Sequence, residues 1–162
     1  LAGEGRRVKL LVAGQGSFEP ELRLRCADLP PDTVVFAGFV ERVERVLGAM
    51  DLQVNASYES ETSSLSLLEG MSMGLPAVAS DCGGNPYLIR DGENGLIFPA
   101  GDSGALAERI RRLMDAPEER AEMGRRAREI FQAHFTGETF AKNVEQVYFE
   151  LLKGATHGTE DT

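Results

Sequence analysis

The sequence predicts an α/β fold, with a doubly wound, mostly parallel Rossmann-like sheet that carries helices on both faces. Short apolar runs alternate with helical patterns over residues 8–100. The runs are nearly continuous in apolar residues, which is typical of parallel strands buried on both faces. Glycine-rich turns follow several of them, as in sheets built from right-handed crossovers. The C-terminal helices are expected to pack alongside this sheet.

The expected elements follow one another in chain order. Strands are predicted at residues 8–14, 33–40, 51–57, 75–81 and 95–100. Between them, helices are predicted at 41–50, where apolar residues recur at helical spacing, and at 64–74 and 85–91. Asp102 suits the N-cap of the first of three closing helices, which are expected at 105–115, 118–135 and 140–152.

The length of 162 residues and the 42% hydrophobic composition fit one compact domain, expected at residues 1–152. The small and polar residues of 153–162 predict a disordered tail, because they cannot offset the entropy lost on ordering. A doubly wound domain that begins here would lack a helix before its first strand. We therefore expect the chain to be part of a longer protein.

Acidic residues outnumber basic ones by 26 to 17, and the net charge of −9 argues against unaided binding to nucleic acid or anionic membranes. Cys26 and Cys82 lie far apart without a C-x-x-C partner, which favours a reduced, cytoplasmic protein with no disulfide framework. His134 and His157 belong to no metal-binding motif, so no metal is expected. No apolar run approaches the length of a membrane span.

Arginines and glutamates are interleaved at helical spacing in the first two closing helices. The arginines are residues 109, 111, 112, 125, 126 and 128, and the glutamates are residues 108, 118, 119, 122 and 129. Opposite charges three or four residues apart attract each other on a helix. The pattern favours a solvated, self-paired surface over a patch that binds lipid phosphate.

The segment Gly14-Gln15-Gly16 follows the first predicted strand, where doubly wound sheets bind nucleotide phosphates at a helix N-terminus. A dinucleotide fingerprint would have a third glycine at Glu19 and an acid at the end of the next strand, where residues 37–39 include none. A dehydrogenase is therefore disfavoured, and a tight turn without a ligand stays open. A glycine turn at 81–86 again follows a strand, whereas the one at 90–95 is best explained as an ordinary turn.

Glu61 and Glu69 stand on either side of a seven-residue spacer, the first ahead of the 64–74 helix and the second within it. The free backbone N–H groups of a helix start can hold a diphosphate, while one carboxylate binds a ribose diol and the other the hydroxyls of a hexose. Two plainer explanations stay open. Ser66 and Glu69 have the spacing of a capping box, and Glu61 fits an ordinary solvated loop acid.

The run from Glu61 to Glu69, followed by GMSMGLPAVASDCGGNPYLIRDGENGLIFPAGD, resembles the E-x7-E donor-site signature of the retaining, GT-B-fold enzymes called glycosyl transferases group 1. The segments LLVAGQG, VVFAGFV and ERVLGAMDLQVNAS are similar to the pattern of that family in the same order, and the resemblance covers about residues 8–130. It implies the nucleotide-sugar-binding C-terminal half of a two-domain enzyme, with an N-terminal half that binds the acceptor. It implies neither a cofactor nor a metal.

The resemblance also implies roles for individual residues. Glu61 matches the acid that contacts the transferred sugar near the reacting carbon, and Glu69 matches the acid that binds the ribose. Backbone N–H groups for the sugar and the diphosphate are expected from Thr62, Ser63, Ser64 and Leu65. The cleft and the site of the base are expected to involve Gly14, Gln15, Gly16, Phe39 and Val40.

The chain departs from the family pattern at three places. Thr62-Ser63-Ser64 replaces the usual Gly-Phe-Gly, which narrows backbone freedom, adds hydroxyls and leads us to expect an uncommon donor sugar. Pro86-Tyr87 replaces a Pro-Glu pair. The arginine and lysine with which the family binds phosphate precede its G-x-G strand, and Arg6 and Arg7 are poor substitutes by position.

The expected function is that of a donor-binding domain of a glycosyltransferase that moves a hexosyl group from a nucleoside diphosphate to an acceptor hydroxyl with retention. As an isolated domain it should bind its donor but hardly turn over. The expected partners are the donor and the acceptor half of the same chain, through which any peripheral membrane contact would run. Two alternatives stay open: a non-catalytic nucleotide-sugar-binding module, and a nucleotide-sugar 2-epimerase, which the lack of a well-placed histidine disfavours.

Overall fold

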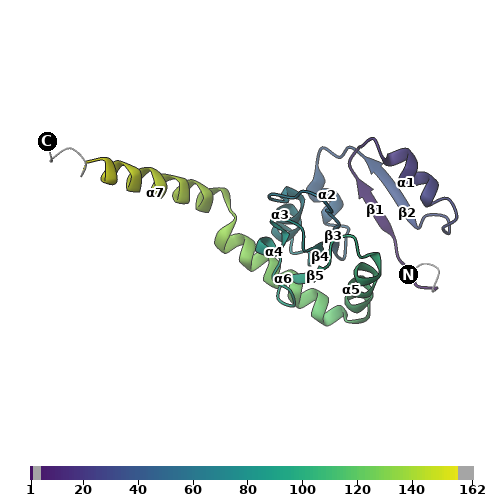
Figure 1. The fold of residues 1–162 in the computed structure, drawn as a ribbon. Helices are drawn as coiled ribbons and strands as arrows, with labels where there is room; N and C mark the ends of the chain where they lie inside the picture. The colour runs from purple at the N-terminus through teal and green to yellow at the C-terminus, as the bar shows by residue number, and fades with distance from the viewer. Residues whose placement is uncertain (2–4, 157–162) are drawn as a thin grey trace.

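A computed structural model of the chain describes Leu1 and residues 5–156. Figure 1 shows an α/β body with an extension at each end: two strands and a helix from the N-terminal part on one side, and a long C-terminal helix on the other. The predicted fold class is confirmed, because parallel strands are flanked by helices.

The strands form two parallel sheets. Strands β1 (Leu10–Ala13) and β2 (Val34–Gly38) make the first sheet. Strands β3 (Gln53–Asn55), β4 (Ala77–Ser80) and β5 (Gly95–Phe98) make the second, in that order. All pairings are parallel, as the apolar runs predict, but the single sheet that we expected is divided. Within the described residues β1 pairs only with β2 and β3 only with β4, so each keeps one unpaired edge.

The helices of the described residues are α1 (Glu19–Arg25), α2 (Val43–Leu47), α3 (Leu65–Ser72), α4 (Asn85–Leu88), α5 (Ser103–Asp115), α6 (Pro117–His134) and α7 (Gly137–Thr156). The expected N-cap Asp102 is confirmed, since its carboxylate accepts a hydrogen bond from the backbone N–H of Ala105 at 2.8 Å. The apolar pattern does not predict α1, because Leu22 and Leu24 alternate with arginines and do not recur at helical spacing. The local signals for α1 are proline and acids at its start and arginines at its end, which suit the helix dipole.

The core surrounds β4, whose residues are all buried. On one face of the strand, Ala77 and Ala79 belong to a cluster with residues of α3 and α6, among them Leu67, Met71, Ala127 and Ile130. On the other face, Val78 belongs to a second cluster with Leu96, Phe98, Leu113 and Met123. Because successive side chains of a strand point to opposite faces, the two clusters show that helices cover both faces of the second sheet. The doubly wound arrangement is therefore present there.

The first sheet lacks a core of its own. No described residue before Leu47 is buried, although β1 and β2 consist mostly of apolar residues. Leu10 is 49% exposed and Val35 is 40% exposed. Apolar strands of a kind that is usually buried on both faces thus lie open in this chain.

Helix α7 projects away from the body, whereas α5 and α6 pack on the second sheet as expected (Figure 1). Large apolar residues recur along one stripe of α7 and are exposed: Phe140, Val144, Val147, Tyr148 and Leu151. The helix continues to Thr156, so the disordered tail predicted from residue 153 is wrong for residues 153–156, and 157–162 lie outside the described residues. None of the helices in the described ranges combines the length and apolar character that a membrane crossing requires.

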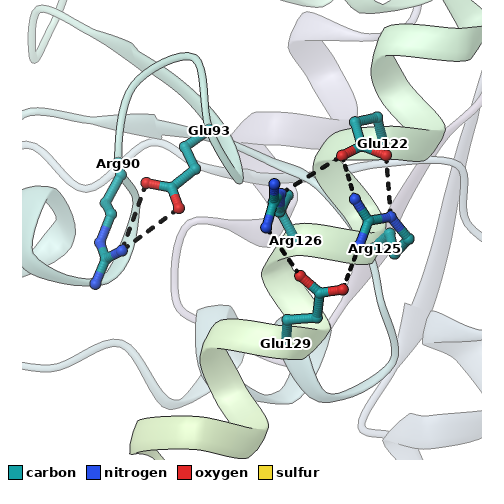
Figure 2. A network of polar contacts seen from close by, with 6 residues as sticks. All are labelled: Arg90, Glu93, Glu122, Arg125, Arg126 and Glu129. Atoms are coloured by element: carbon teal, nitrogen blue, oxygen red, sulfur yellow. Dashed lines mark hydrogen bonds and ion pairs between the residues drawn. The ribbon is translucent and has the colours of Figure 1, made fainter.

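Ion pairs cover an exposed face of α6, as Figure 2 shows. Arg125 and Arg126 both pair with Glu122 and Glu129. The hydrogen bond donated by Arg125 holds the pKa of the Glu122 carboxyl below its usual value. Nearby, Arg90 and Glu93 pair at 3.5 Å within the 90–95 turn. The predicted self-paired surface is confirmed for Arg125 and Arg126 of α6.

Candidate functional site

The loops that follow β3, β4 and β5 form one surface at the carboxyl edge of the second sheet. They comprise residues 56–64, 81–84 and 99–102. The Asp81 carboxylate accepts a hydrogen bond from the backbone N–H of Ala100 at 2.7 Å, and the Glu61 carbonyl accepts one from the N–H of Gly84 at 2.9 Å. Ligands of open parallel sheets bind at this edge.

Gly83 and Gly84 allow the chain around Glu61 to lie directly on the turn between β4 and α4. Gly83 has a φ of 54°, which favours glycine, and a Cβ atom there would overlap the Glu61 carbonyl oxygen. A Cβ atom on Gly84 would overlap the carbonyl oxygen of Thr62. The glycine turn predicted at a strand end is therefore present, and its glycines set the position of the Glu61 loop.

The Glu61 side chain is half-buried and is held from the end of β3. Its Oε2 atom accepts hydrogen bonds from Ser57 Oγ at 3.1 Å and from Asn55 Nδ2 at 3.5 Å. Glu61 is therefore held by the fold and is not a freely solvated loop acid. Local sequence patterns alone do not identify Asn55 and Ser57; the available signal is a pair of polar residues at the end of a predicted strand.

Helix α3 begins just after Glu61, with Ser64 as its N-cap. The Ser64 hydroxyl accepts a hydrogen bond from the backbone N–H of Leu67 at 3.4 Å, and the residue is 4% exposed. The capping box that remained open for Ser66 and Glu69 is therefore wrong, because Ser66 lies inside the helix. Glu69 is exposed in the second turn and forms no hydrogen bond or ion pair through its carboxylate with the described residues.

The start of α3 offers backbone N–H groups to an anion. Thr62, Ser63 and Leu65 are all exposed, so this end of the helix faces solvent. The first turn contains no acidic residue that would compete for the partial positive charge of the helix N-terminus. A phosphate group is stabilised at such a helix start. Within Leu1 and 5–156, no group of three or more His, Cys, Asp or Glu residues lies close enough together to hold a metal ion.

The other expected site residues lie at the carboxyl edge of the first sheet. The Gly14 N–H donates to the Gly38 carbonyl at 2.7 Å, which places the turn of residues 14–16 beside Phe39 and Val40. Gly14, Gln15 and Gly16 are exposed, and Phe39 is 74% exposed. In the described part of the chain no hydrogen bond or ion pair joins this group to the Glu61 loop. The structure thus brings the expected residues together in two sets, one at each sheet.

Tyr87, one of the departures from the family pattern, lies on α4 and is exposed. Its ring packs edge-on against Phe135 at the end of α6, with ring centroids 6.2 Å apart. This contact accounts for an aromatic residue at this position.

Comparisons with known proteins agree with this fold. Residues 1–116 match the family described as Glycosyl transferases group 1. The chain is 32% identical over 151 residues to N-acetyl-alpha-D-glucosaminyl L-malate synthase of Bacillus anthracis, covering 93% of this chain and 39% of that protein. It resembles HepE of Anabaena in complex with UDP-glucose with a TM-score of 0.81 and 25% identity, covering 88% of this chain and 41% of HepE. It resembles sucrose-phosphate synthase of Thermosynechococcus elongatus with a TM-score of 0.80 and 28% identity, covering 90% of this chain and 39% of that one.

The parallel α/β fold and these matches define the class of the molecule as a glycosyltransferase domain of the GT-B type. The chain belongs to the glycosyl transferases group 1 family, as the sequence resemblance indicated. It spans about two fifths of the length of the relatives named above.

Proposed function

We propose that the chain is the donor-binding half of a glycosyltransferase that transfers a hexosyl group from a nucleoside-diphosphate sugar to an acceptor hydroxyl with retention of configuration. One arrangement carries this proposal. The carboxylate of Glu61 is held in place beside the open N-terminus of α3, and the same helix bears a second, exposed carboxylate at Glu69. The UDP-glucose bound by HepE is a ligand of the proposed class.

Each group suits one part of such a donor. The backbone N–H groups of residues 62–66 stabilise the diphosphate, because they carry partial positive charge at the helix start. The Glu61 carboxylate accepts hydrogen bonds from the sugar near its reacting carbon, and the Glu69 carboxylate accepts them from the ribose diol. The turn of residues 14–16 lines the cleft, and Phe39 and Val40 lie near the base.

Catalysis in this proposal depends on stabilisation of the leaving group. When the bond between the sugar and the diphosphate breaks, negative charge grows on the diphosphate oxygen. Backbone N–H groups and cations aimed at that oxygen lower the free energy of the transition state, and no metal is required.

We propose that this site works in a longer, two-domain enzyme whose other half binds the acceptor. The unpaired edges of β1 and β3, the exposed apolar strands before Leu47 and the apolar stripe of α7 support this proposal. Each of them exposes groups that proteins usually cover. On this basis the 162-residue chain should bind the donor but hardly turn over.

We further propose a cytoplasmic location, which the two free cysteines Cys26 and Cys82 support. The proposed partners are the nucleotide sugar and the acceptor half of the same enzyme. The net charge of −9 disfavours nucleic acid, and any peripheral contact with a membrane is assigned to the other half.

A non-catalytic nucleotide-sugar-binding module would use the same site, and the departures from the family pattern at Thr62-Ser63-Ser64 and at Tyr87 favour it. Substitution of Glu61 by alanine in the longer enzyme separates the two functions, since a module has no transfer activity to lose. A 2-epimerase has less support, because the histidine in the described residues, His134, is exposed at the end of α6.

Titration of UDP, GDP and ADP, each with and without an attached sugar, tests the proposal. Wild-type protein should prefer one base, and Glu69→Ala should weaken binding by about 1–3 kcal/mol, or about 5- to 150-fold, because a charged hydrogen bond to the ribose is lost. Glu108→Ala is the matched control, since it removes an exposed carboxylate from helix α5. Equal binding by wild type and Glu69→Ala would exclude Glu69 from the site.

A further inference from the structure

The side chains that hold Glu61 belong to a polar network centred on Asn55, the last residue of β3. Asn55 Oδ1 accepts hydrogen bonds from the backbone N–H of Ser57 at 3.0 Å and from Asn85 Nδ2 at 3.2 Å. Asn55 Nδ2 donates to Ser64 Oγ at 2.9 Å and to Glu61 Oε2 at 3.5 Å. If the Asn55 amide were flipped, its NH₂ group would face two other donors, the Ser57 N–H and Asn85 Nδ2. These contacts therefore fix the orientation of the Asn55 side chain.

Ser57 provides the second donor to Glu61 and is tied to the core. Its hydroxyl donates to Glu61 Oε2 at 3.1 Å, and its carbonyl oxygen accepts a hydrogen bond from Ser80 Oγ at 2.7 Å. Ser80 is fully buried at the end of β4. The two donors thus converge on one oxygen of the Glu61 carboxylate, and both are anchored in the second sheet.

Asn85 supports this arrangement from the first residue of α4. It is fully buried, and its Nδ2 donates to Asn55 Oδ1 and to Ser80 Oγ, both at 3.2 Å. Its own Oδ1 has no hydrogen-bond partner in the described residues. A buried carbonyl oxygen without a partner destabilises a fold, so packing alone does not explain an asparagine here. Both of its donated hydrogen bonds go to groups that hold the Glu61 loop.

We propose that Asn55 and Ser57 are positioning residues that fix Glu61 Oε2, so that Glu61 Oε1 is left to accept a hydrogen bond from a hydroxyl of the transferred sugar. Asn85 and Ser80 act one step further out, by holding Asn55 and Ser57. This inference rests on the proposed function and adds the residues that strengthen binding of the sugar part of the donor. Asn55 also holds Ser64, the N-cap of the helix whose N–H groups are assigned to the diphosphate. Ser57 contacts Glu61 and not that cap, so its substitution isolates the effect on the sugar.

The experiment compares the dissociation constants of a nucleotide and its nucleotide sugar for wild-type protein and for Ser57→Ala. The probes are UDP and UDP-glucose, GDP and GDP-mannose, and ADP and ADP-glucose. For the pair that wild type binds, Ser57→Ala should raise the dissociation constant of the nucleotide sugar by about 5- to 20-fold. It should raise the dissociation constant of the bare nucleotide by less than about twofold. Ser57→Thr keeps the hydroxyl and should restore the preference for the sugar.

Two further variants complete the design. Ser60→Ala is the matched control, because it removes an exposed hydroxyl of the same loop that forms no hydrogen bond with the described residues. Asn55→Asp keeps the size of the side chain and its acceptor, but turns a charged oxygen toward Glu61 Oε2 in place of a donor. It should reduce the preference for the sugar at least as much as Ser57→Ala, with the thermal melting temperature showing that each variant is folded.

The outcomes separate this inference from the proposed function. If Ser57→Ala weakens binding of the nucleotide and of the nucleotide sugar equally, or weakens binding of neither, the network is only structural. The inference is then overturned, while the proposal of donor binding stands. If Asn55→Asp does not fold, the comparison of Ser57→Ala with Ser57→Thr decides the question. If wild-type protein binds none of the six probes, the proposed function fails and the inference fails with it.

Discussion

The close contact between Gly83 and the Glu61 backbone can be tested by the substitution Gly83→Ala. Two effects contribute to its expected cost. The φ of 54° lies in the left-handed region, where an L-residue is disfavoured by about 1–2 kcal/mol. The new Cβ atom would also overlap the Glu61 carbonyl oxygen, so the loop must move, and such overpacking costs about 1–3 kcal/mol. We therefore expect the free energy of unfolding to fall by about 2–5 kcal/mol.

Gly92→Ala is a matched control for the backbone effect. Gly92 has a φ of 81°, and no atom lies within 4 Å of a Cβ atom built there. Its substitution should cost only the strain of the left-handed backbone, about 1–2 kcal/mol. Urea unfolding followed by circular dichroism gives both values, and the difference between them isolates the contact with Glu61.

Donor binding provides the second measurement on the same pair of variants. Gly83→Ala displaces the segment that carries Glu61, so it should weaken binding of the nucleotide sugar that wild type binds. Gly92→Ala should leave this binding unchanged. Equal losses of stability in the two variants, together with unchanged donor binding in Gly83→Ala, would refute the view that the Glu61 loop rests on Gly83.

The remaining predictions concern α7 and the ion pairs of α6. Leu151 is 65% exposed, so Leu151→Ala should change the free energy of unfolding of this chain by no more than about 0.5 kcal/mol, whereas Leu113→Ala in the core should cost about 2–5 kcal/mol, both measured by urea unfolding. A loss above 1 kcal/mol for Leu151→Ala would mean that α7 packs on the body. Arg125 lowers the pKa of Glu122 in the folded state. The stabilisation from their pairing is therefore fully present at pH values above the pKa of an unfolded-state glutamate, about 4.3, and is lost as the pH falls through the lower folded-state pKa. Stability measured between pH 5.5 and 3 should therefore fall less steeply in Arg125→Ala than in wild type, and an equal slope would contradict the pairing.

Local sequence patterns predicted most of the elements because short apolar runs mark the strands, whether the core covers them, as in β4, or leaves them open, as in β1 and β2. All residues of β4 are buried, which matches its continuous apolar run, and Asp102 caps α5 as its position before an amphipathic segment indicated. Helix α1 was missed because its two leucines alternate with arginines and leave no stripe at helical spacing. The division of the sheet was also missed, since an apolar run indicates a strand but not the partner with which it pairs.

The helix cap beside the site illustrates where local patterns become ambiguous. Ser64 and Ser66 both precede a helical segment, and Ser66 even has Glu69 at the spacing of a capping box. The choice between them is set by a residue from another element, because Asn55 Nδ2 donates to Ser64 Oγ at 2.9 Å from the end of β3. That hydrogen bond fixes Ser64 as the N-cap and leaves Glu69 exposed in the helix.

The sequence by itself determined the fold class, the family and the spacing of the two acids, because these depend on residue types at short range along the chain. The tertiary structure alone decided what holds Glu61. Asn85 donates to Asn55 across thirty positions of the chain, and Gly83 and Gly84 lie under the backbone of residues 61 and 62. Such contacts exist only because β3 and β4 lie side by side in one register, Gln53 opposite Ala77, which brings the residues after both strands to the same edge of the sheet.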